Sequence, residues 1–516
     1  MRHMEALSEK IFLKLDMPND QNRRGDRDKI FDALKEKYGQ VVIPYKILKE
    51  LYPKCREANF EITVTLARRD YDWVVTKIEC GDTTHNHYGL CVDLGSTTVI
   101  MRLVDLNTGN IITEECIFNK EIKFGEDILN RIFYTRNSKE KLYEVHKAAI
   151  DTFLELLDII EKKTNVKGED ISIMTVAGNT TMIHFLLNID PWTIFQTPYT
   201  PVFNQPGFIN AEEIGIPISG YVYCFPSVAN YFGGDIVSGL LYTEIYDSDE
   251  ISAFIDIGTN GELVIGNKDF LVAVAGAAGP ALEGGISKFG MRAKKGAIDT
   301  IKIINNEIKY TTIENGKPLG ICGSGIVDLL SEMFLNGWVD FSGELKENAS
   351  KHIIKVDNEL AVEYASKDES KNQESLIFTQ SDINQFLKTK SAAYTMVAFL
   401  LGEVGLTLDD LDRFYAAGAF GTHLNLESAV TIGMYPDLDR NKFNCPGNTS
   451  LEGAYKLLTN RNLLSKVDNI ASKINYIGLE NAKDFLEKMR GASFLPHTDI
   501  DNYPSVKANL IKRGLL

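Results

Sequence analysis

One short pattern occurs twice in this chain, and it constrains the fold more than any other feature. The two copies are Asp93-Leu94-Gly95-Ser96-Thr97-Thr98 and Asp256-Ile257-Gly258-Thr259-Asn260-Gly261. A short apolar run precedes each copy and another follows it, so each copy predicts a strand, a tight turn and a second strand. The separation between the copies is too long for a solenoid repeat and favours two homologous lobes.

Each copy is followed later in the chain by a further strand that ends in glycine. Residues 171–177 run into Gly178-Asn179-Thr180-Thr181, and residues 414–417 run into Gly418-Ala419-Phe420-Gly421. A helix-like stretch precedes each of these strands, over residues 142–160 and 382–405. Strands that alternate with helices predict mixed sheets covered on both sides, and in such sheets ligands bind at the carboxyl ends of the strands.

The chemistry of the two turns favours phosphate binding. A tight hairpin with glycine at its tip exposes backbone N–H groups that can cradle phosphate oxygens. The side-chain donors of the turns are Ser96, Thr97, Thr98, Thr259 and Asn260. Asp93 and Asp256 supply hard oxygen ligands for Mg²⁺. Ordinary hairpins are the alternative, but two copies in matching strand contexts favour a nucleotide whose polyphosphate is gripped by both lobes.

Other glycine-rich segments accompany these turns. The loop Gly418-Ala419-Phe420-Gly421 brings backbone close enough to pass under an adenine or a ribose. In Gly233-Gly234-Asp235, Asp235 either caps a helix or is an active-site acid that positions water or metal. Residues 276–285 and 320–325 either contact a ligand through a helix N-terminus or only permit close packing. Cys322 is expected to be a small buried residue.

The chain is expected to contain four parts. Residues 1–87 form a small α+β domain, with a helix from Asp26 and a strand at 60–66 whose hairpin partner follows at 73–78. The polar run 82–87 at its end is expected to be a solvated linker, including its two histidines. The other predicted parts are a first lobe at 88–250, a second lobe at 251–496 and a C-terminal tail at 497–516.

Composition excludes several classes of function. The 516 residues include 71 acidic and 55 basic side chains, giving a net charge of −16, which disfavours nucleic acid and membranes as partners. The seven cysteines contain no Cys-x-x-Cys pair, so no iron–sulfur cluster is expected in this chain. The start is not signal-like, and no run of about 18 apolar residues occurs, so we expect a cytoplasmic protein.

The duplicated hairpins and the later glycine strand end resemble the phosphate and adenosine motifs of the superfamily of sugar kinases, heat-shock chaperones and actin (ASKHA). Residues from about 89 to 496 resemble one branch more closely, the ATP-dependent reductive activators of corrinoid-dependent methyltransferases, and residues 1–87 resemble its middle domain. Besides the two hairpins, the segments that carry this resemblance are Asn119 through Arg131, 177–182, 232–235, 279–284, 322–325, 417–421 and Gly447-Asn448.

The resemblance implies a two-lobed α/β ASKHA fold that binds ATP with Mg²⁺. It also implies an ATPase, commonly a homodimer, that docks a corrinoid methyl-carrier protein and supports its return from the inactive cob(II) state to cob(I). In such proteins an amino-terminal iron–sulfur domain passes the electrons. No cysteine set with ferredoxin spacing occurs here. We expect a separate iron–sulfur protein to be the electron donor, and the alternative is that the chain keeps the ATPase and has lost the redox role.

Two alternatives remain open at this point. One is an ASKHA-type phosphotransferase that acts on a small hydroxylated substrate, with Asp235 as the candidate base. The other is a non-catalytic nucleotide-binding regulator. The predicted catalytic residues are Asp93, Asp256 and Asp235, and Asp93 and Asp256 are also the predicted metal ligands. The predicted nucleotide-binding residues are Gly95, Ser96, Thr97, Thr98, Gly258, Thr259, Asn260, Gly261, Gly418, Ala419, Phe420 and Gly421.

Overall fold

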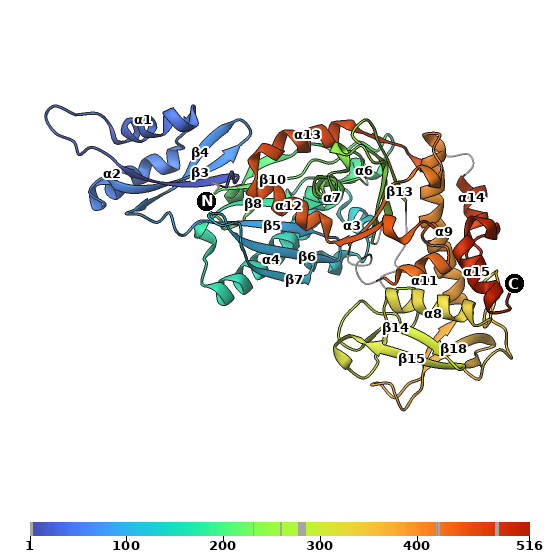
Figure 1. The fold of residues 1–516 in the computed structure, drawn as a ribbon. Coiled ribbons are helices and arrows are strands. Elements are labelled where there is room, and N and C mark those ends of the chain that lie inside the picture. Colours follow the sequence, from blue (N-terminus) through green and yellow to red (C-terminus); the bar gives the residue numbers. More distant parts are fainter. Residues whose placement is uncertain are drawn as a thin grey trace. The chain divides into compact units, whose positions relative to one another are not determined.

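The computed structural model forms two compact units (Figure 1). The first contains Met1–Glu244 and Thr449–Lys473, and the second contains Ile245–Asn448 and Ile474–Leu516. The structure describes residues 4–230, 232–258, 261–276, 285–418, 421, 424–479 and 485–516. No helix in these ranges is long and apolar enough to cross a membrane.

The first unit begins with a small α+β domain, as predicted. Its four-stranded sheet has the order β1-β3-β4-β2. Its elements are β1 (Ser8–Lys14), α1 (Asp26–Tyr38), β2 (Val41–Val42), α2 (Tyr45–Glu57), β3 (Glu61–Arg69) and β4 (Asp72–Cys80). The expected hairpin is the antiparallel pair β3–β4, and the two helices bury one apolar face each, led by Ile30 and Leu34 and by Ile47 and Leu51.

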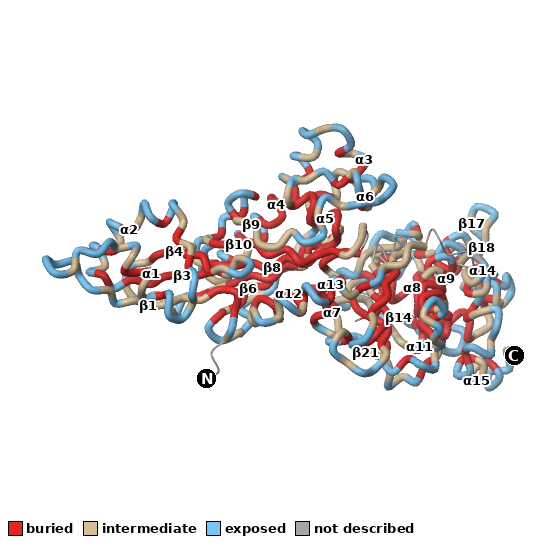
Figure 2. The backbone as a smooth tube through the Cα atoms, turned by 90° about the horizontal axis from the view of Figure 1, so that it is seen from above, coloured by how far each residue is buried: buried red, intermediate tan, exposed pale blue. Residues whose placement is uncertain are grey.

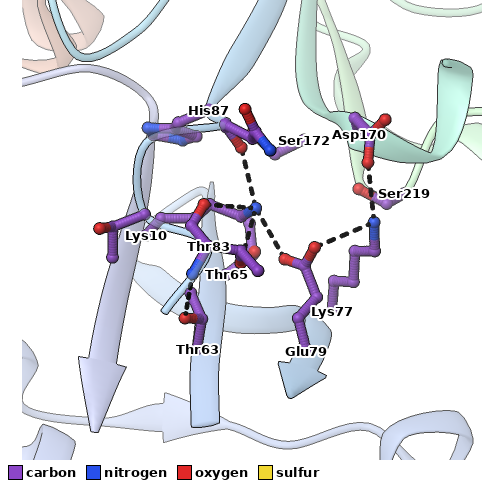
Figure 3. Close-up of polar contacts among 12 residues, drawn as sticks. Lys10, Thr63, Thr65, Lys77, Glu79, Thr83, His87, Asp170, Ser172 and Ser219 are labelled. Carbon is purple, nitrogen blue, oxygen red and sulfur yellow. Dashed lines mark hydrogen bonds and ion pairs between the residues drawn. The ribbon is translucent and has the colours of Figure 1, made fainter. Parts of the chain in front are cut away.

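The run 82–87, which was expected to be solvated, is partly built into this unit (Figure 3). His87 is buried, and its Nε2 lies 3.0 Å from Ser8 Oγ. Lys10 Nζ donates to Asn86 O at 2.8 Å and pairs with Glu79 at 2.7 Å, while Lys77 pairs with Asp170 at 3.1 Å. The prediction of a solvated His87 was therefore wrong, because this histidine fills the junction between the small domain and the first lobe.

The first lobe is built on a six-stranded sheet of order β7-β6-β5-β8-β10-β9. Its strands are β5 (Tyr88–Leu94), β6 (Thr98–Asp105), β7 (Ile111–Phe118), β8 (Ile171–Gly178), β9 (Gly207–Asn210) and β10 (Tyr221–Cys224). β5 and β6 form an antiparallel hairpin, whereas β8 pairs with β5 in parallel and β10 continues in parallel beyond it. Figure 2 shows that burial concentrates in strands such as β6, β8 and β10.

The helices of the first unit pack on this sheet. They are α3 (Ile128–Thr135), α4 (Lys139–Thr164), α5 (Thr180–Leu186), α6 (Trp192–Phe195), α7 (Gly234–Thr243), α12 (Thr449–Thr459) and α13 (Leu464–Lys473), with the short 3₁₀ helix η1 (Lys120–Phe124). α4 packs along β6 and β7, and α12 packs along β5, β8 and α7. Residues 449–473 thus group with the first unit, although the second lobe predicted from the sequence ran through them.

The second unit repeats the same sheet plan. Its six-stranded sheet has the order β21-β20-β11-β12-β13-β22. The strands are β11 (Ser252–Ile257), β12 (Gly261–Gly266), β13 (Leu271–Gly276), β20 (Arg413–Ala417), β21 (Phe443–Gly447) and β22 (Ile474–Tyr476). β11 and β12 form the antiparallel hairpin, and β20 and β21 follow β11 in parallel, as β8 and β10 follow β5. This matching order confirms the predicted duplication.

The second unit also carries two small sheets and its own helices. The small sheets are β15-β14-β16 and β17-β18-β19. Their strands are β14 (Ala297–Ile304), β15 (Glu307–Thr312), β16 (Gly320–Ile321), β17 (Ile353–Val356), β18 (Glu359–Ala365) and β19 (Leu376–Thr379). The helices are α8 (Gly323–Leu335), α9 (Gln380–Glu403), α11 (Leu426–Thr431), α14 (Phe485–Ala492) and α15 (Pro504–Lys512). Residues 497–516, expected to form a C-terminal tail, pack on this unit, since Tyr503, Val506 and Leu510 are buried in its core.

Candidate functional site

The hairpin between β5 and β6 is the best-defined part of the candidate site. Gly95 is required in its turn, because a Cβ at this position would lie 2.6 Å from Thr98 O. Asn119 holds two carbonyl groups of the turn: its Nδ2 donates to Gly95 O at 3.0 Å, and its backbone N donates to Thr97 O at 2.9 Å. Arg131 Nη2 donates to the third carbonyl, Ser96 O, at 2.6 Å.

Arg131 is fully buried behind this turn. Its Nε donates to Gly125 O at 2.9 Å, and its Nη1 pairs with Glu121 at 3.1 Å. Glu121 is fully buried as well, and burial raises the pKa of its carboxyl to about 8 against the opposing pull of Arg131. Asp127 accepts a hydrogen bond from Asn130 N at 2.7 Å and caps α3, the helix that carries Arg131, so its role is structural.

Asp93 lies at the carboxyl edge of the first sheet, at the end of β5. It is opposite Ala177 in the parallel ladder, and its neighbour Leu94 is opposite Gly178. A Cβ on Gly178 would lie 2.9 Å from Leu94 O, so these two strand ends pack backbone to backbone. Beyond β8, the side chain of Asn179 caps α5 by accepting a hydrogen bond from Thr181 N at 3.0 Å.

The two glycines before Asp235 bring a third segment to this edge. A Cβ on Gly233 would lie 2.6 Å from Asn179 Cα, and one on Gly234 would lie 2.7 Å from Phe225 Cβ. Asp235 is therefore in the first turn of α7, on the same edge as Asp93. Its Oδ1 accepts a hydrogen bond from Ile236 N at 2.9 Å, while the N-cap position itself is Gly233.

Sequence reasoning missed Ser450. Its Oγ donates to Asp93 Oδ1 at 2.8 Å, and its carbonyl accepts from Ser238 Oγ at 2.7 Å, so it links α12, α7 and the end of β5. The close crossing of these helices needs Gly453, whose Cβ would lie 1.9 Å from Ser238 O. The sequence does place Gly447-Asn448 immediately before an amphipathic stretch. No local pattern, however, indicates that this stretch packs against Asp93.

The second unit repeats part of this arrangement. Asp256 is opposite Ala417 at the end of the parallel pair β11–β20. Gly418 follows with a φ of 81°, and a Cβ there would lie 2.6 Å from Asp256 Oδ1. The structure thus brings Asp256 and Gly418 together, with Gly258 beside a space open to a Cβ and Gly261 at the start of β12. Thr259, Asn260, Ala419 and Phe420 lie outside the described residues.

The structure describes one of the two other candidate segments. Cys322 is buried and directs its Sγ to Ile298 O at 3.3 Å, and a Cβ on Gly325 would lie 2.5 Å from the same oxygen. Segment 320–325 therefore serves close packing of α8 against β14. Most of segment 276–285 lies outside the described residues. His184 is a buried core residue, stacked on Phe203 with ring centroids 4.2 Å apart.

The first-unit edge fits the phosphates of a nucleotide better than a preformed metal cage. Within the described ranges, no group of three or more His, Cys, Asp or Glu side chains could hold a metal ion. Mg²⁺ commonly reaches a nucleotide site with only one or two carboxylates, the phosphates supplying further ligands. Asp93, beside a glycine hairpin and the N-termini of α7 and α12, fits that role.

Models of known protein families match this chain. Family models match three consecutive parts of the chain: the RACo linker region at residues 2–85, the RACo middle region at 88–248, and the C-terminal domain of RACo, the ASKHA domain, at 250–507. The chain belongs to the RACo family. Residues 1–87 correspond to the RACo linker, which corrects their assignment to the middle domain, and the RACo middle region is the first lobe.

Individual relatives agree with this placement. A solved structure described as a reductive activator for corrinoid, iron-sulfur protein shares 38% identity with a TM-score of 0.90, covering 97% of this chain and 81% of its own. The corrinoid activation enzyme RamQ of Eubacterium limosum is 29% identical over 78% of this chain and 69% of its own length. A [Co(II) methylated amine-specific corrinoid protein] reductase of Methanosarcina barkeri is 22% identical over 75% of this chain and 73% of its length.

Proposed function

We propose that this chain is an ATP-binding and ATP-hydrolysing activator of a corrinoid protein, and that it supports reduction of the inactive cob(II) state to cob(I). The observation that carries the proposal is the duplicated sheet plan. In each unit an aspartate ends the central strand beside a glycine hairpin, in a chain whose relatives are named for corrinoid activation.

The nucleotide contacts follow from the two hairpins. Gly95, Ser96, Thr97 and Thr98 would bind phosphate oxygens in the first unit, and the hairpin 258–261 would do so in the second. The loop at Gly418 would contact the adenosine. Asp93 and Asp256 would hold Mg²⁺, directly or through water, because carboxylate oxygens suit this hard cation. Asp235 would orient the water that attacks the terminal phosphate.

ATP supplies the free energy for an uphill electron transfer. One electron from a separate iron–sulfur protein would reduce Co(II) to Co(I), while ATP and water give ADP and phosphate. A conformational change of the chain would connect nucleotide state to docking of the corrinoid protein. A corrinoid methyl-carrier protein as partner, a homodimer and a cytoplasmic location belong to the same proposal.

The test is ATP turnover by the purified chain, with and without a cob(II)-loaded corrinoid methyl-carrier protein. Stimulation of turnover by the corrinoid protein is the expected result. Turnover that is stimulated instead by small sugars or polyols would favour the phosphotransferase. ATP binding without turnover under every partner condition would favour the regulator, and either result would contradict the proposal.

A further inference from the structure

Two residues outside the hairpin, Asn119 and Arg131, hold the turn Gly95–Thr97 through two side-chain contacts and one backbone contact. Its three consecutive carbonyl groups accept hydrogen bonds from Asn119 Nδ2, Arg131 Nη2 and Asn119 N, at 3.0, 2.6 and 2.9 Å. Such a turn needs no side-chain support to close, since Gly95 already permits it. Closure of the turn therefore does not explain why Asn119 and Arg131 bond to its carbonyl groups.

The direction of the peptide groups supplies that explanation. In a planar trans peptide, the C=O of one residue and the N–H of the next point in opposite directions. The N–H groups of Ser96, Thr97 and Thr98 therefore point away from the donors that hold the carbonyls of Gly95, Ser96 and Thr97. Successive N–H groups that face one way form a concave anion site.

The anchors are rigid because they are buried and connected. Asn119 has an exposed fraction of 1% and Arg131 of 0%. Arg131 is also bound to Gly125 O and Glu121, so its guanidinium is held by a residue within η1 and by the residue that follows η1. Burial without competing water makes each of these hydrogen bonds costly to lose.

We propose that Asn119 and Arg131 are positioning residues for phosphate binding, which orient the N–H groups of the turn at 95–98 toward the phosphates of the nucleotide. This inference rests on the proposed function, because it assigns a supporting set to the same nucleotide site. Neither residue touches the nucleotide, so both act through the backbone of the turn. Their loss should weaken binding of phosphates and leave binding of the nucleoside unchanged.

The experiment compares the affinities of the full chain for ATP with Mg²⁺ and for AMP by titration calorimetry. Asn119→Ala removes a hairpin anchor and the cap of η1, whereas the matched control Asp127→Ala removes the cap of α3 and no hairpin contact. Thr135→Val is a second control, since its buried hydroxyl donates to Ile132 O on the same helix as Arg131. Arg131→Met and the conservative Arg131→Lys complete the set.

We expect Asn119→Ala and Arg131→Met to lower ATP affinity about tenfold or more, with AMP affinity within about twofold of the unaltered chain. Arg131→Lys should restore part of the loss, and both controls should keep ATP affinity. A general structural defect would lower both affinities together and would overturn the inference, as would unchanged ATP affinity in folded Asn119→Ala.

If neither Arg131 variant folds, Asn119→Ala alone decides. If the unaltered chain binds no ATP, the proposed function fails and the inference fails with it, whereas ATP binding that both anchor variants retain overturns the inference alone.

Discussion

Asp93 joins three elements of the candidate site. It ends β5, faces β8 across the ladder and accepts a hydrogen bond from Ser450 on α12. Its carboxylate is only partly buried, so it keeps access to a cation while its orientation is set by the hydroxyl of Ser450. This combination of a fixed direction and partial exposure is what a Mg²⁺ ligand requires.

Asp93→Ala should abolish binding of Mg-ATP and leave the fold intact, because the residue lies at a strand end and not in the apolar core. Titration calorimetry measures the affinity, and a thermal melt checks the fold. Ser450→Ala is the companion variant, since it removes only the orienting hydrogen bond and should weaken binding without abolishing it. Unchanged ATP affinity in Asp93→Ala would remove Asp93 from the site.

Glu121 predicts a pH effect on stability. Burial raises its pKa from the ordinary 4.5 to about 8, so between these values the folded chain binds a proton that the unfolded chain releases. Its contribution to stability is full below about pH 4.5 and is lost as the pH rises through 8. The free energy of unfolding should therefore fall less with rising pH in Glu121→Gln than in the unaltered chain. The difference should be at most a few kcal/mol, because one pKa unit is worth about 1.4 kcal/mol. Urea unfolding at pH 5.5 and 8.5 would measure it, and an equal fall in both proteins would contradict the assignment.

Among the elements of the second unit, the ends of β11 and β20 meet at Gly418. This residue follows β20 with a positive φ, and it leaves the space that the carboxylate of Asp256 occupies. A side chain at this position has two separate costs, strain in the left-handed backbone and a collision with Asp256. Of these two costs, the collision with Asp256 is the one that affects the candidate site.

Gly418→Ala should therefore weaken ATP binding as well as stability. Gly405→Ala is the matched control, because Gly405 has a φ of 69° and nothing within 4 Å of its Cβ position. Both substitutions should cost about 1–2 kcal/mol of backbone strain, measured by urea unfolding. Only Gly418→Ala should lower ATP affinity, and an equal affinity in the two variants would show that the contact with Asp256 does not matter.

The junction between the small domain and the first lobe should respond to acid. Burial lowers the pKa of His87 from 6.5 to about 4, so the folded chain holds this ring neutral, with Lys10 adding to the effect. The stability from neutral His87 is present above about pH 6.5 and is lost as the pH falls toward 4. The melting temperature should drop between pH 7 and 5, and His87→Gln should show a smaller drop. An identical drop in both proteins would place the acid-sensitive group elsewhere.

In the whole molecule, the features that could be predicted from the sequence are those with a local pattern of repeated motifs or alternating apolar and polar residues. The two hairpins, their parallel partners β8 and β20 and the helix from Asp26 all follow from short patterns and are confirmed. What it did not predict depends on distant contacts. Ser450 reaches Asp93 because residues 449–473 return to the first unit, and the buried ring of His87 lies against Ser8, which is distant in sequence. No local pattern encodes which distant surface a polar side chain will meet.

Formation of cob(I) on a cob(II)-loaded corrinoid methyl-carrier protein, followed by its visible absorption, is the direct test of whether this chain is an ATP-dependent activator. The reaction contains the chain, a reduced iron–sulfur protein as electron donor, and Mg-ATP. The account predicts cob(I) only when the chain and ATP are both present, and its loss in Asp93→Ala. Cob(I) formation that proceeds equally without ATP, or without the chain, would contradict it.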